Sequence, residues 1–316
     1  LSIALPILLA VAFIIILIVL IVILIILYAG VIFADFIAPY GTVAFDSIYK
    51  DSAPSKIHYK YDGEWVGPHV YMLTKHSDKK TLRVTYEEDT SEYYPIKFFV
   101  HGVKYKVLGF IPCDLHLFGL GTGSNGGTAA KIYLFGGDSL GRDIFSRIFL
   151  GSKISLTIPF VAAVISLFLG VLLGGISGYF GGIVDFIIQR IIEVIGAVPQ
   201  IPLWLALSAA IPPGTSSLKM YFYMTIILSF INWTGMARTV RGKFLSLKNE
   251  DYVLSARLSG VTTWNIIWTH LVPGFMSYLI VAVTRSIPSS IIGETSMSYL
   301  GLGIKTPATS WGVTLQ

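Results

Sequence analysis

The chain has 316 residues, of which 54% are apolar and only 13% are charged, and its mean hydropathy is +0.72. These values lie far from those of soluble globular proteins, so they exclude an ordinary soluble domain and indicate a membrane protein. The 23 lysines and arginines slightly exceed the 18 aspartates and glutamates. The positive-inside bias of membrane proteins accounts for that excess without a nucleic-acid partner.

Five segments contain the roughly 20 apolar residues that a helix needs to cross a bilayer. They are residues 3–33, 153–179, 184–211, 219–237 and 274–293. The first apolar run is about twice as long as the core of a signal peptide, so we expect a retained anchor. The sequence therefore predicts an all-α polytopic membrane protein.

The region between the first two spans differs in composition from its surroundings. It holds five of the six histidines and the only cysteine, Cys113. Three short runs mix β-branched and aromatic residues and favour strands, at 80–86, 96–101 and 104–110. The HGV sequence at 101–103 is typical of a hairpin turn, and the glycine-rich segment 121–130 is typical of a flexible linker. The sequence thus predicts an inserted extracytoplasmic β-rich domain.

Aromatic and histidine side chains of this insertion have two readings. Tyr93, Tyr94, Phe98 and Phe99 could stack on a ligand, but we favour a place in the core of the domain. The histidines lack the spacing of known metal-ligand motifs, so we expect structural or surface roles for His58, His69, His76, His101 and His116. A single cysteine also excludes an internal disulfide.

Residues 250–274 form a polar interruption between two apolar spans. Lipid cannot accommodate so many polar groups, so this segment must lie in water. We expect two short amphipathic helices with a break at Gly260, and we expect Pro273 to open the next membrane helix. The spacing i, i+3, i+4, i+7 predicts one apolar stripe in the second helix, formed by Trp264, Ile267, Trp268 and Leu271.

Basic residues indicate which side of the membrane this segment occupies. The loop expected after the fourth span contains Arg238, Arg241, Lys243, Lys248 and Arg257. The opposite loop contains only Lys219. The positive-inside rule therefore places residues 238–272 in the cytoplasm and the insertion outside.

Four stretches resemble the permeases of ABC importers. Ser255, Ala256, Gly260 and Pro273 fall in register with the EAA loop of that family, E-A-A-x3-G followed by a distant proline. Leu254 stands where the loop usually has its glutamate. Three further stretches are similar to peptide permeases, namely IAPY at 37–40, GGDSLGRDIFSRIFLGSKISL at 136–156 and GETSMSYLGLGIKTPATSWG at 293–312. The chain resembles the second, C-type permease subunit of the oligopeptide, dipeptide and nickel group.

This resemblance implies a type I ABC importer permease bundle of six helices, of which five are present. Because the chain begins at Leu1 and ends at Gln316, we expect further native residues at both ends, including a sixth helix. We divide the chain into a first helix, the insertion and a permease domain, at 1–34, 35–150 and 151–316. The cytoplasmic coupling loop is expected at 246–273.

The resemblance also implies partners and site residues. The expected partners are a homologous sister permease, two cytoplasmic ABC ATPase subunits, an extracytoplasmic substrate-binding protein and membrane lipid. ATP and magnesium would bind to the ATPase subunits, and this chain would bind no cofactor and catalyse no reaction. The expected ATPase contacts are Glu250, Asp251, Leu254, Ser255, Ala256, Arg257, Gly260 and Pro273. Glu250 lies one helical turn before Leu254 and is a candidate substitute for the missing glutamate.

Polar residues within the spans are candidates for a translocation path. They are Asn232, Trp233, Arg285, Ser289 and Glu294. Helix–helix contacts are the alternative for such residues. We expect Arg190 and Glu193 to pair with each other, and we expect the glycines at 170, 174, 175 and 178 to pack closely against another helix.

The expected function is ATP-driven import of oligopeptides or dipeptides across a bacterial or archaeal cytoplasmic membrane. Related permeases carry nickel, glutathione or oligosaccharides, so those cargoes remain alternatives. An ion-coupled carrier would need isolated carboxylates near the bilayer midplane, whereas the acidic residues here cluster near span ends. A receptor is a further alternative, because it would explain the large outer domain. The chain lacks the phosphate-binding motif G-x-x-x-x-G-K-[ST], so it does not bind ATP by that route.

Overall fold

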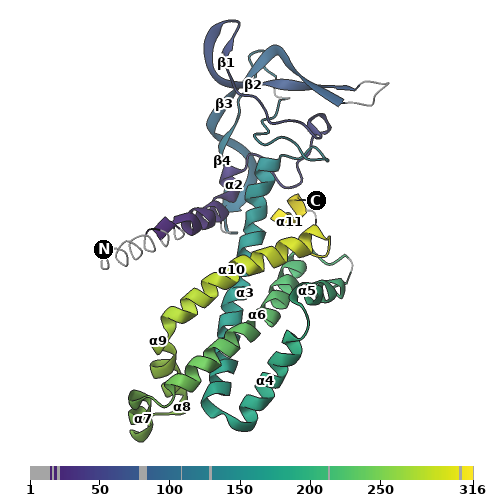
Figure 1. Cartoon of the computed structure of the whole chain (residues 1–316). Helices are drawn as coiled ribbons and strands as arrows, with labels where there is room; N and C mark the ends of the chain where they lie inside the picture. The colour runs from purple at the N-terminus through teal and green to yellow at the C-terminus, as the bar shows by residue number, and fades with distance from the viewer. Residues whose placement is uncertain are drawn as a thin grey trace, which may run out of the picture. The chain divides into compact units, whose positions relative to one another are not determined.

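The chain divides into two compact units, each with its own core (Figure 1). The computed structural model describes residues 15, 18–19, 22–77, 84–107, 109–127, 130–212, 214–305 and 308–315. The first unit comprises Leu1–Lys153 with Pro307–Thr314, and the second comprises Ile154–Thr306 with Leu315–Gln316.

The first unit is built on an antiparallel four-stranded sheet in the order β1-β2-β3-β4. Its strands are β1 (His58–Tyr61), β2 (Glu64–Ser77), β3 (Val84–Val107) and β4 (Ile111–Leu120). Before the sheet come an apolar helical segment, Val22–Ile32, and two short helices, α2 (Ala34–Ile37) and η1 (Ser47–Tyr49). The prediction of strands at 96–101 and 104–107 is confirmed. Of the predicted first span, the structure describes residues 15, 18–19 and 22–33. Residues 80–83 of the first predicted strand lie outside the described residues.

Strand β3 is long enough to pair with a different strand along each half. Its residues up to Pro95 pair with β2, and those from Ile96 onward pair with β4. The predicted turn at 101–103 is therefore wrong, because these residues lie inside β3 next to a register shift. A side-chain carbon on Gly102 would lie 2.7 Å from the His116 ring, so close approach of that ring requires the glycine. The chain instead reverses near Gly109, where φ is +85°.

The core of the first unit is formed by side chains of the sheet and of the segment that follows β4. It contains Val70, Tyr94, Phe118, Ala130 and Ile132. The expected core position of Tyr94 is confirmed, but the expectation for Phe98 and Phe99 is wrong because both side chains are exposed. Phe99 has a φ of +55°, which breaks the alternation of strand side chains and directs both rings outward.

The glycine-rich segment after β4 is a bonded turn over its described part, 121–127, rather than a free linker. The backbone N–H groups of Asn125 and Gly127 donate to Glu92 at 2.8 and 3.0 Å. These bonds, with the one from Gly127 as the largest contribution, lower the pKa of the Glu92 carboxyl. The sequence pattern missed this because a glycine-rich turn and a glycine-rich linker have the same composition.

The second unit consists of helices. They are the greater part of α3 (Ile144–Phe180), then α4 (Gly182–Gly196), α5 (Gln200–Ala209), α6 (Ser217–Leu247), α7 (Asp251–Leu258), α8 (Thr263–Asn265), η2 (Ile266–Leu271), α9 (Val272–Gly274) and α10 (Met276–Tyr299). The final short helix, α11 (Trp311–Thr314), belongs to the first unit.

Two helices of the described chain, α3 and α10, are long and apolar enough to span a membrane. Helices α4 and α5 form a third candidate span only as a pair that is bent by 83°. The predicted span at 184–211 is therefore not one continuous helix, because it breaks between Gly196 and Gln200. Pro199 lacks an N–H and disfavours a helical conformation at the residue before it, which explains the break. The predicted fourth span, at 219–237, lies within the single helix α6.

Glycines on α3 allow α6 to approach closely, as the sequence predicted. A side-chain carbon on Gly170 would lie 2.4 Å from Met236, and one on Gly174 would lie 2.4 Å from the Ala237 carbonyl oxygen. Gly178 likewise contacts the backbone of Arg241. Because the obstacles at Gly174 and Gly178 include backbone atoms, no rotamer change in α6 would make room. These contacts fix α3 against α6.

Candidate functional site

The polar segment 250–274 folds as two short helical pieces separated at Gly260, as predicted. Helix α7 ends in a Schellman motif, in which the Gly260 N–H donates to the Arg257 carbonyl and the Val261 N–H donates to the Ala256 carbonyl. Gly260 has a φ of +76°, and nothing lies within 4 Å of the position of its missing side chain. The glycine is therefore required by backbone conformation and not by space.

The second piece contains one turn of π-helix, and this changes which residues it buries. Ile266, Ile267 and Leu271 are buried, whereas Trp264 and Trp268 are exposed. The predicted stripe is thus wrong at both tryptophans. A π-helix has more residues per turn than the α-helix on which the i, i+3, i+4, i+7 spacing rests, so the buried face moves by one position.

The buried side of α7 to α9 shares one core with the long helices. Val253 and Ala256 of α7, with the buried isoleucines and leucine of η2, pack with residues of α3, α6 and α10. Those residues are Val171, Met236, Val240, Phe244 and Leu279. Of the predicted ATPase contacts, Ala256 is the buried one, and the others are exposed. The segment is thus a packed extension of the helices with one free surface.

Apolar side chains lie on the exposed side of α7. Leu258 is 90% exposed and Leu254, one helical turn earlier, is 38% exposed. Leu258 was not predicted from the sequence, because the prediction of this site relied on the spacing of its glycine and proline. The signal was available, since Val253 and Ala256 define the buried face and place Leu254 and Leu258 away from it. Apolar side chains held in water by a folded helix are typical of a contact surface.

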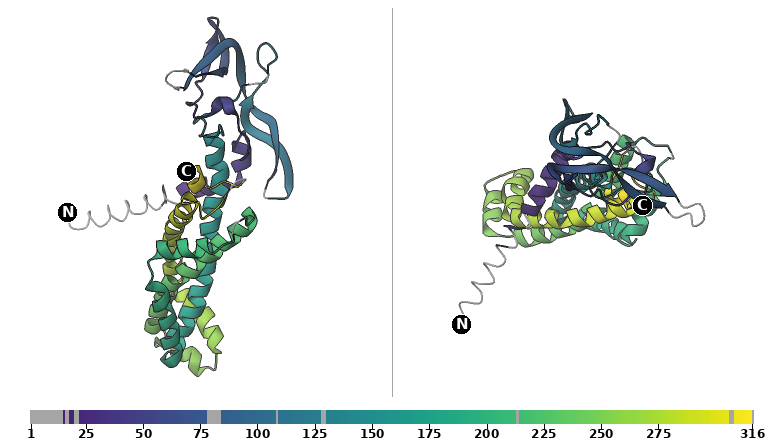
Figure 2. Two further views of the ribbon diagram at one scale, coloured as in Figure 1. Left: turned by 90° about the vertical axis from the view of Figure 1, so that its right-hand side faces the viewer. Right: turned by 90° about the horizontal axis from the view of Figure 1, so that it is seen from above.

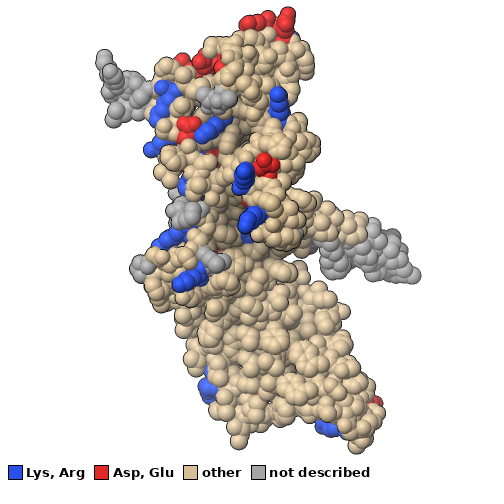
Figure 3. Space-filling model, turned by 180° about the vertical axis from the view of Figure 1, so that it is seen from behind, with Lys and Arg blue, Asp and Glu red and all other residues tan. Residues whose placement is uncertain are grey.

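Basic residues anchor this region to neighbouring helices. Arg241 of α6 makes two hydrogen bonds of 2.5 Å to Asp185 of α4, and the guanidinium of Arg257 lies 5.5 Å from the centre of the Tyr179 ring. Lys248 donates to the Gly178 carbonyl at 3.2 Å. The assignment of Arg238, Arg241 and Lys243 to a loop is wrong, because α6 continues to Leu247. Figure 3 shows few charged side chains over the visible helical face apart from those near its lower end.

A cavity of about 600 Å³ lies among α3, α4, α5, α6 and α10. Three of the predicted path residues line it, namely Asn232, Arg285 and Ser289. Arg238, which was not predicted, lines it as well. Asn232 donates to the Ser290 hydroxyl at 2.8 Å, so it also ties α6 to α10. None of the described residues that line the cavity is acidic.

The other two predicted path residues lie away from the cavity. Trp233 is buried against Ile192 and Ala237. Glu294 is fully buried and accepts hydrogen bonds from the hydroxyls of Ser155 and Ser298 at 2.8 and 2.7 Å. The predicted pairing of Arg190 with Glu193 is confirmed at 2.8 Å. The sequence predicts that these residues lie on spans. The orientation of each helix about its own axis decides which of them line the cavity.

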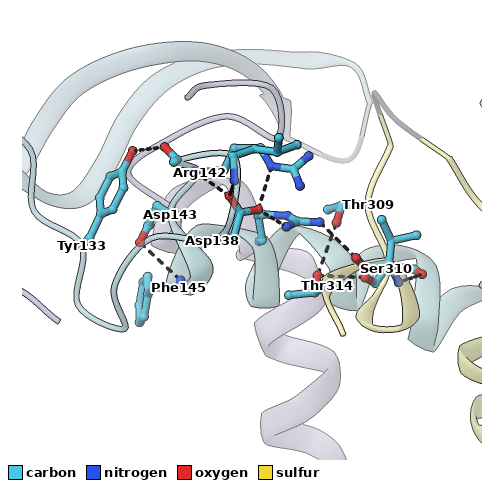
Figure 4. A network of polar contacts seen from close by, with 12 residues as sticks. Tyr133, Asp138, Arg142, Asp143, Phe145, Thr309, Ser310 and Thr314 are labelled. Carbon is cyan, nitrogen blue, oxygen red and sulfur yellow. Dashed lines mark hydrogen bonds and ion pairs between the residues drawn. The ribbon is translucent and has the colours of Figure 1, made fainter. Parts of the chain in front are cut away.

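In the first unit, the segments 136–153 and 307–314 meet in a polar network (Figure 4). Asp138 accepts hydrogen bonds from the backbone and side chain of Arg142 at 2.9 and 2.8 Å, and it pairs with Arg147. Arg147 also donates to the Val313 carbonyl at 3.3 Å. The indole N–H of Trp311 donates to the Ile148 carbonyl at 3.0 Å. These contacts hold α11 against the start of α3.

Asp143 precedes α3 and caps its first turn. Its carboxyl accepts from the backbone N–H groups of Phe145 and Ser146, at 3.3 and 2.9 Å, and from the Ser146 hydroxyl at 2.6 Å. Burial is the largest influence on this group, and it raises the pKa of Asp143 to about 6. The start of α3 thus carries a carboxyl group that titrates in a mildly acidic range.

The histidines of the sheet make separate contacts. His58 pairs with Glu88 at 3.0 Å, His101 pairs with Asp114 at 2.9 Å, and the His116 ring lies 3.0 Å from the Val103 carbonyl oxygen. Among the residues that the structure describes, no group of three or more histidine, cysteine or acidic side chains is arranged to hold a metal ion.

Comparison with known proteins identifies the helical part of the chain. Residues 170–316 match the family described as "Binding-protein-dependent transport system inner membrane component". The matched residues make up slightly less than half of the chain. The matched segment contains the exposed surface of α7 and every lining residue of the cavity except Ser166. With its apolar helices, it makes the chain a multi-pass membrane protein.

The relatives that match this chain are named as permease proteins of transport systems. The oligopeptide transport system permease protein OppC of Bacillus subtilis is 40% identical over 183 residues, which are 58% of each chain. The dipeptide transport system permease protein DppC of the same species is 41% identical, over 57% of this chain and 54% of the relative. The glutathione transport system permease protein GsiD of Pectobacterium atrosepticum is 38% identical, over 59% and 60%. The chain thus spans somewhat more than half the length of these relatives.

Proposed function

We propose that this chain is a transmembrane permease subunit of an ATP-driven ABC importer for oligopeptides or dipeptides. It forms half of the translocation path and couples to an ATPase through the segment 250–274. The observation that carries the proposal is the exposed Leu258 on α7, in a segment that shares one core with α3, α6 and α10. The names of the relatives that are about 40% identical support the peptide cargo.

Packing explains how a contact at α7 acts on the path. ATP-driven closure of the ATPase pair displaces α7, and the shared core transmits this displacement because close-packed side chains deform little. Phe244 and Leu279 lie in that core, and both α6 and α10 line the cavity farther along. The helices therefore move together with α7 and change access to the cavity.

The proposed assembly contains a homologous sister permease, two ATPase subunits and a substrate-binding protein. ATP and magnesium bind to the ATPase subunits, and this chain supplies no catalytic residue. The complex lies in the cytoplasmic membrane of a bacterium or archaeon, with α7 in the cytoplasm and the sheet of the first unit outside. The basic residues of α6 and α7 support this orientation.

Replacement of Leu258 by aspartate tests the coupling surface. Because a buried carboxylate without a partner is costly in a protein interface, we expect Leu258→Asp to prevent co-purification of the ATPase subunits. Leu140→Asp is the matched control, since Leu140 is an exposed leucine of the first unit. Retention of the ATPase by the Leu258 variant would contradict the proposed docking surface. Co-purification of no ATPase by the unmodified chain would instead favour a carrier or a receptor.

Glutathione is a second candidate cargo, because the relative from Pectobacterium is named for its transport and is 38% identical. Glutathione is itself a small peptide, so the same path would suit both. Uptake of a labelled peptide into proteoliposomes that hold the whole complex, measured with unlabelled competitors, distinguishes the cargoes. We expect competition by unlabelled dipeptides or oligopeptides, and competition by glutathione alone would favour the second candidate.

A further inference from the structure

The half of β3 that pairs with β4 forms a hairpin with an unusual number of exposed apolar side chains. The β3–β4 hairpin comprises residues 96–107 and 109–120 in the described chain. Phe98, Phe99 and Phe110 are 66%, 63% and 69% exposed, and Val103 and Ile111 are also exposed. A strand with one buried face would turn alternate side chains inward. This hairpin instead exposes two consecutive phenylalanines.

The backbone conformation of β3 causes the exposure of these phenylalanines. Phe99 has a φ of +55°, an outlier for a bulky residue, and such strain persists only where the surrounding structure imposes it. The hairpin is well tied around it. Phe98 pairs with Phe118, Val107 pairs with Ile111, and the Tyr105 hydroxyl donates to the Leu115 carbonyl at 2.6 Å. The aromatic side chains are therefore presented by a hydrogen-bonded hairpin whose register shifts between His101 and Tyr105.

The hairpin lies beside the end of the apolar N-terminal helix. The rings of Phe36 in α2 and Phe99 are 6.2 Å apart, and Val103 approaches Gly41. Helix α2 directly follows Val22–Ile32, where Ile25 and Ile26 are exposed. Apolar side chains exposed along a helix are typical of a segment that is surrounded by lipid. Figure 2 shows the hairpin extending away from the other strands of the sheet.

Cations accompany the apolar side chains. Lys97, Lys104 and Lys106 are exposed on the same hairpin, whereas its acidic residue Asp114 is paired with His101. Aromatic rings beside lysines are the composition that binds the boundary between headgroups and acyl chains. Lysines near the membrane surface add electrostatic attraction to anionic lipid.

We propose that the β3–β4 hairpin is a membrane-interface anchor, whose phenylalanines enter the headgroup boundary of the lipid around the N-terminal helix. Lys104 and Lys106 contact anionic headgroups. The hairpin thereby fixes the first unit at the membrane surface. This inference does not depend on the proposed transport function, because it rests only on the first unit and its helix. Contact with another protein is the competing occupant, and the experiment separates the two.

The single cysteine of the chain makes a spin-label test direct. In a Cys113→Ser background, Phe110→Cys carries the label and Trp65→Cys is the control, because Trp65 is an exposed aromatic residue at the start of β2. The full chain is reconstituted in vesicles that contain phosphatidylglycerol. We expect the label at 110 to be several-fold more accessible to oxygen than to a water-soluble nickel chelate. The label at 65 should show the reverse.

Two outcomes would overturn the proposal. If the label at 110 is as accessible to the nickel chelate as the label at 65, the hairpin lies in water. If both reagents fail to reach it, the hairpin is covered by protein. A second measurement tests the charges, since Lys104→Gln with Lys106→Gln should raise nickel accessibility at 110 in anionic vesicles. No change in that variant would contradict the role of the lysines.

Discussion

Gly260 shows how one residue links backbone conformation to coupling. Its φ of +76° strains any residue with a side chain by about 1–2 kcal/mol, although the surrounding space is open. We expect Gly260→Val to leave membrane insertion intact and to abolish ATP hydrolysis that depends on the permease. The measurement is the ATPase rate of the reconstituted complex with and without binding protein. Gly63→Val is the control, because Gly63 has a φ of +84° in similarly open space. Unchanged coupling in the Gly260 variant would contradict the assignment.

Asp143 makes a pH-dependent contribution at the start of α3. Its pKa is raised to about 6 in the folded state, so its contribution to stability is fully present below its unfolded pKa near 4. That contribution is lost as the pH rises through about 6, and it is on the order of 3 kcal/mol. We expect the thermal midpoint of the unmodified protein, relative to Asp143→Asn, to fall between pH 4 and pH 7. Asparagine keeps the capping geometry without the charge. Parallel pH profiles for the two proteins would contradict this.

Leu254 is the residue at which coupling should differ from related permeases. The usual carboxylate is absent there, while Glu250 lies one turn earlier and is exposed. If Glu250 supplies the substitute charge, Glu250→Gln should lower coupled ATP hydrolysis several-fold. Asp251→Asn is the comparison, because Asp251 is the adjacent exposed acid and is also an expected ATPase contact. Equal effects of the two substitutions would indicate a general influence of charge in the first turn of α7.

At the scale of elements, the contact between α3 and α6 depends on missing side chains. A methyl group at Gly174 would lie 2.4 Å from a backbone oxygen of α6, so Gly174→Ala should destabilise the protein by about 1–3 kcal/mol. Gly242 lies within α6 with nothing within 4 Å of its missing side chain. Gly242→Ala should therefore raise stability by about 0.5–1 kcal/mol. Thermal unfolding in detergent compares the two, and a loss of stability in both would contradict the packing argument.

The elements also show what local sequence can and cannot determine. The break at Gly260 and the close approach at Gly174 were predictable, because a glycine there has one physical purpose. Gly102 had two possible purposes, a turn or room for the His116 ring, and the sequence could not choose between them. The predicted apolar stripe of the second short helix was wrong for a similar reason. Its spacing assumes an α-helix, and the π-helix at Ile266–Leu271 depends on packing with α6 and α7.

At the scale of the molecule, the candidate site combines residues that are distant in sequence. Asn232 and Ser289 were predictable as polar residues within spans, but Trp233 next to Asn232 packs against Ile192 and does not line the cavity. Arg238 was assigned to a loop, because the positive-inside rule counts charges without locating the end of a helix. Helix rotation and length follow from contacts among α3, α4, α6 and α10. Those contacts are not encoded in any one segment.

Arg285 provides the test of the whole path. It lines the cavity ten residues into α10, and the described residues that line that cavity with it include no acid. A cation is costly in a membrane helix, so its presence there favours a role in the path. We expect Arg285→Gln to lower solute uptake about tenfold, the equivalent of one charged hydrogen bond, while ATPase subunits still co-purify.

Arg190→Gln is the matched control for that prediction. Arg190 is also a helical arginine, but it is exposed and paired with Glu193, and it does not line the cavity. Its replacement removes only a surface ion pair, which is worth at most about 1 kcal/mol. Uptake by the Arg190 variant should therefore match that of the unmodified protein. Equal losses in both variants would mean that positive charge on these helices acts on assembly, and the cavity would then have no special place in transport.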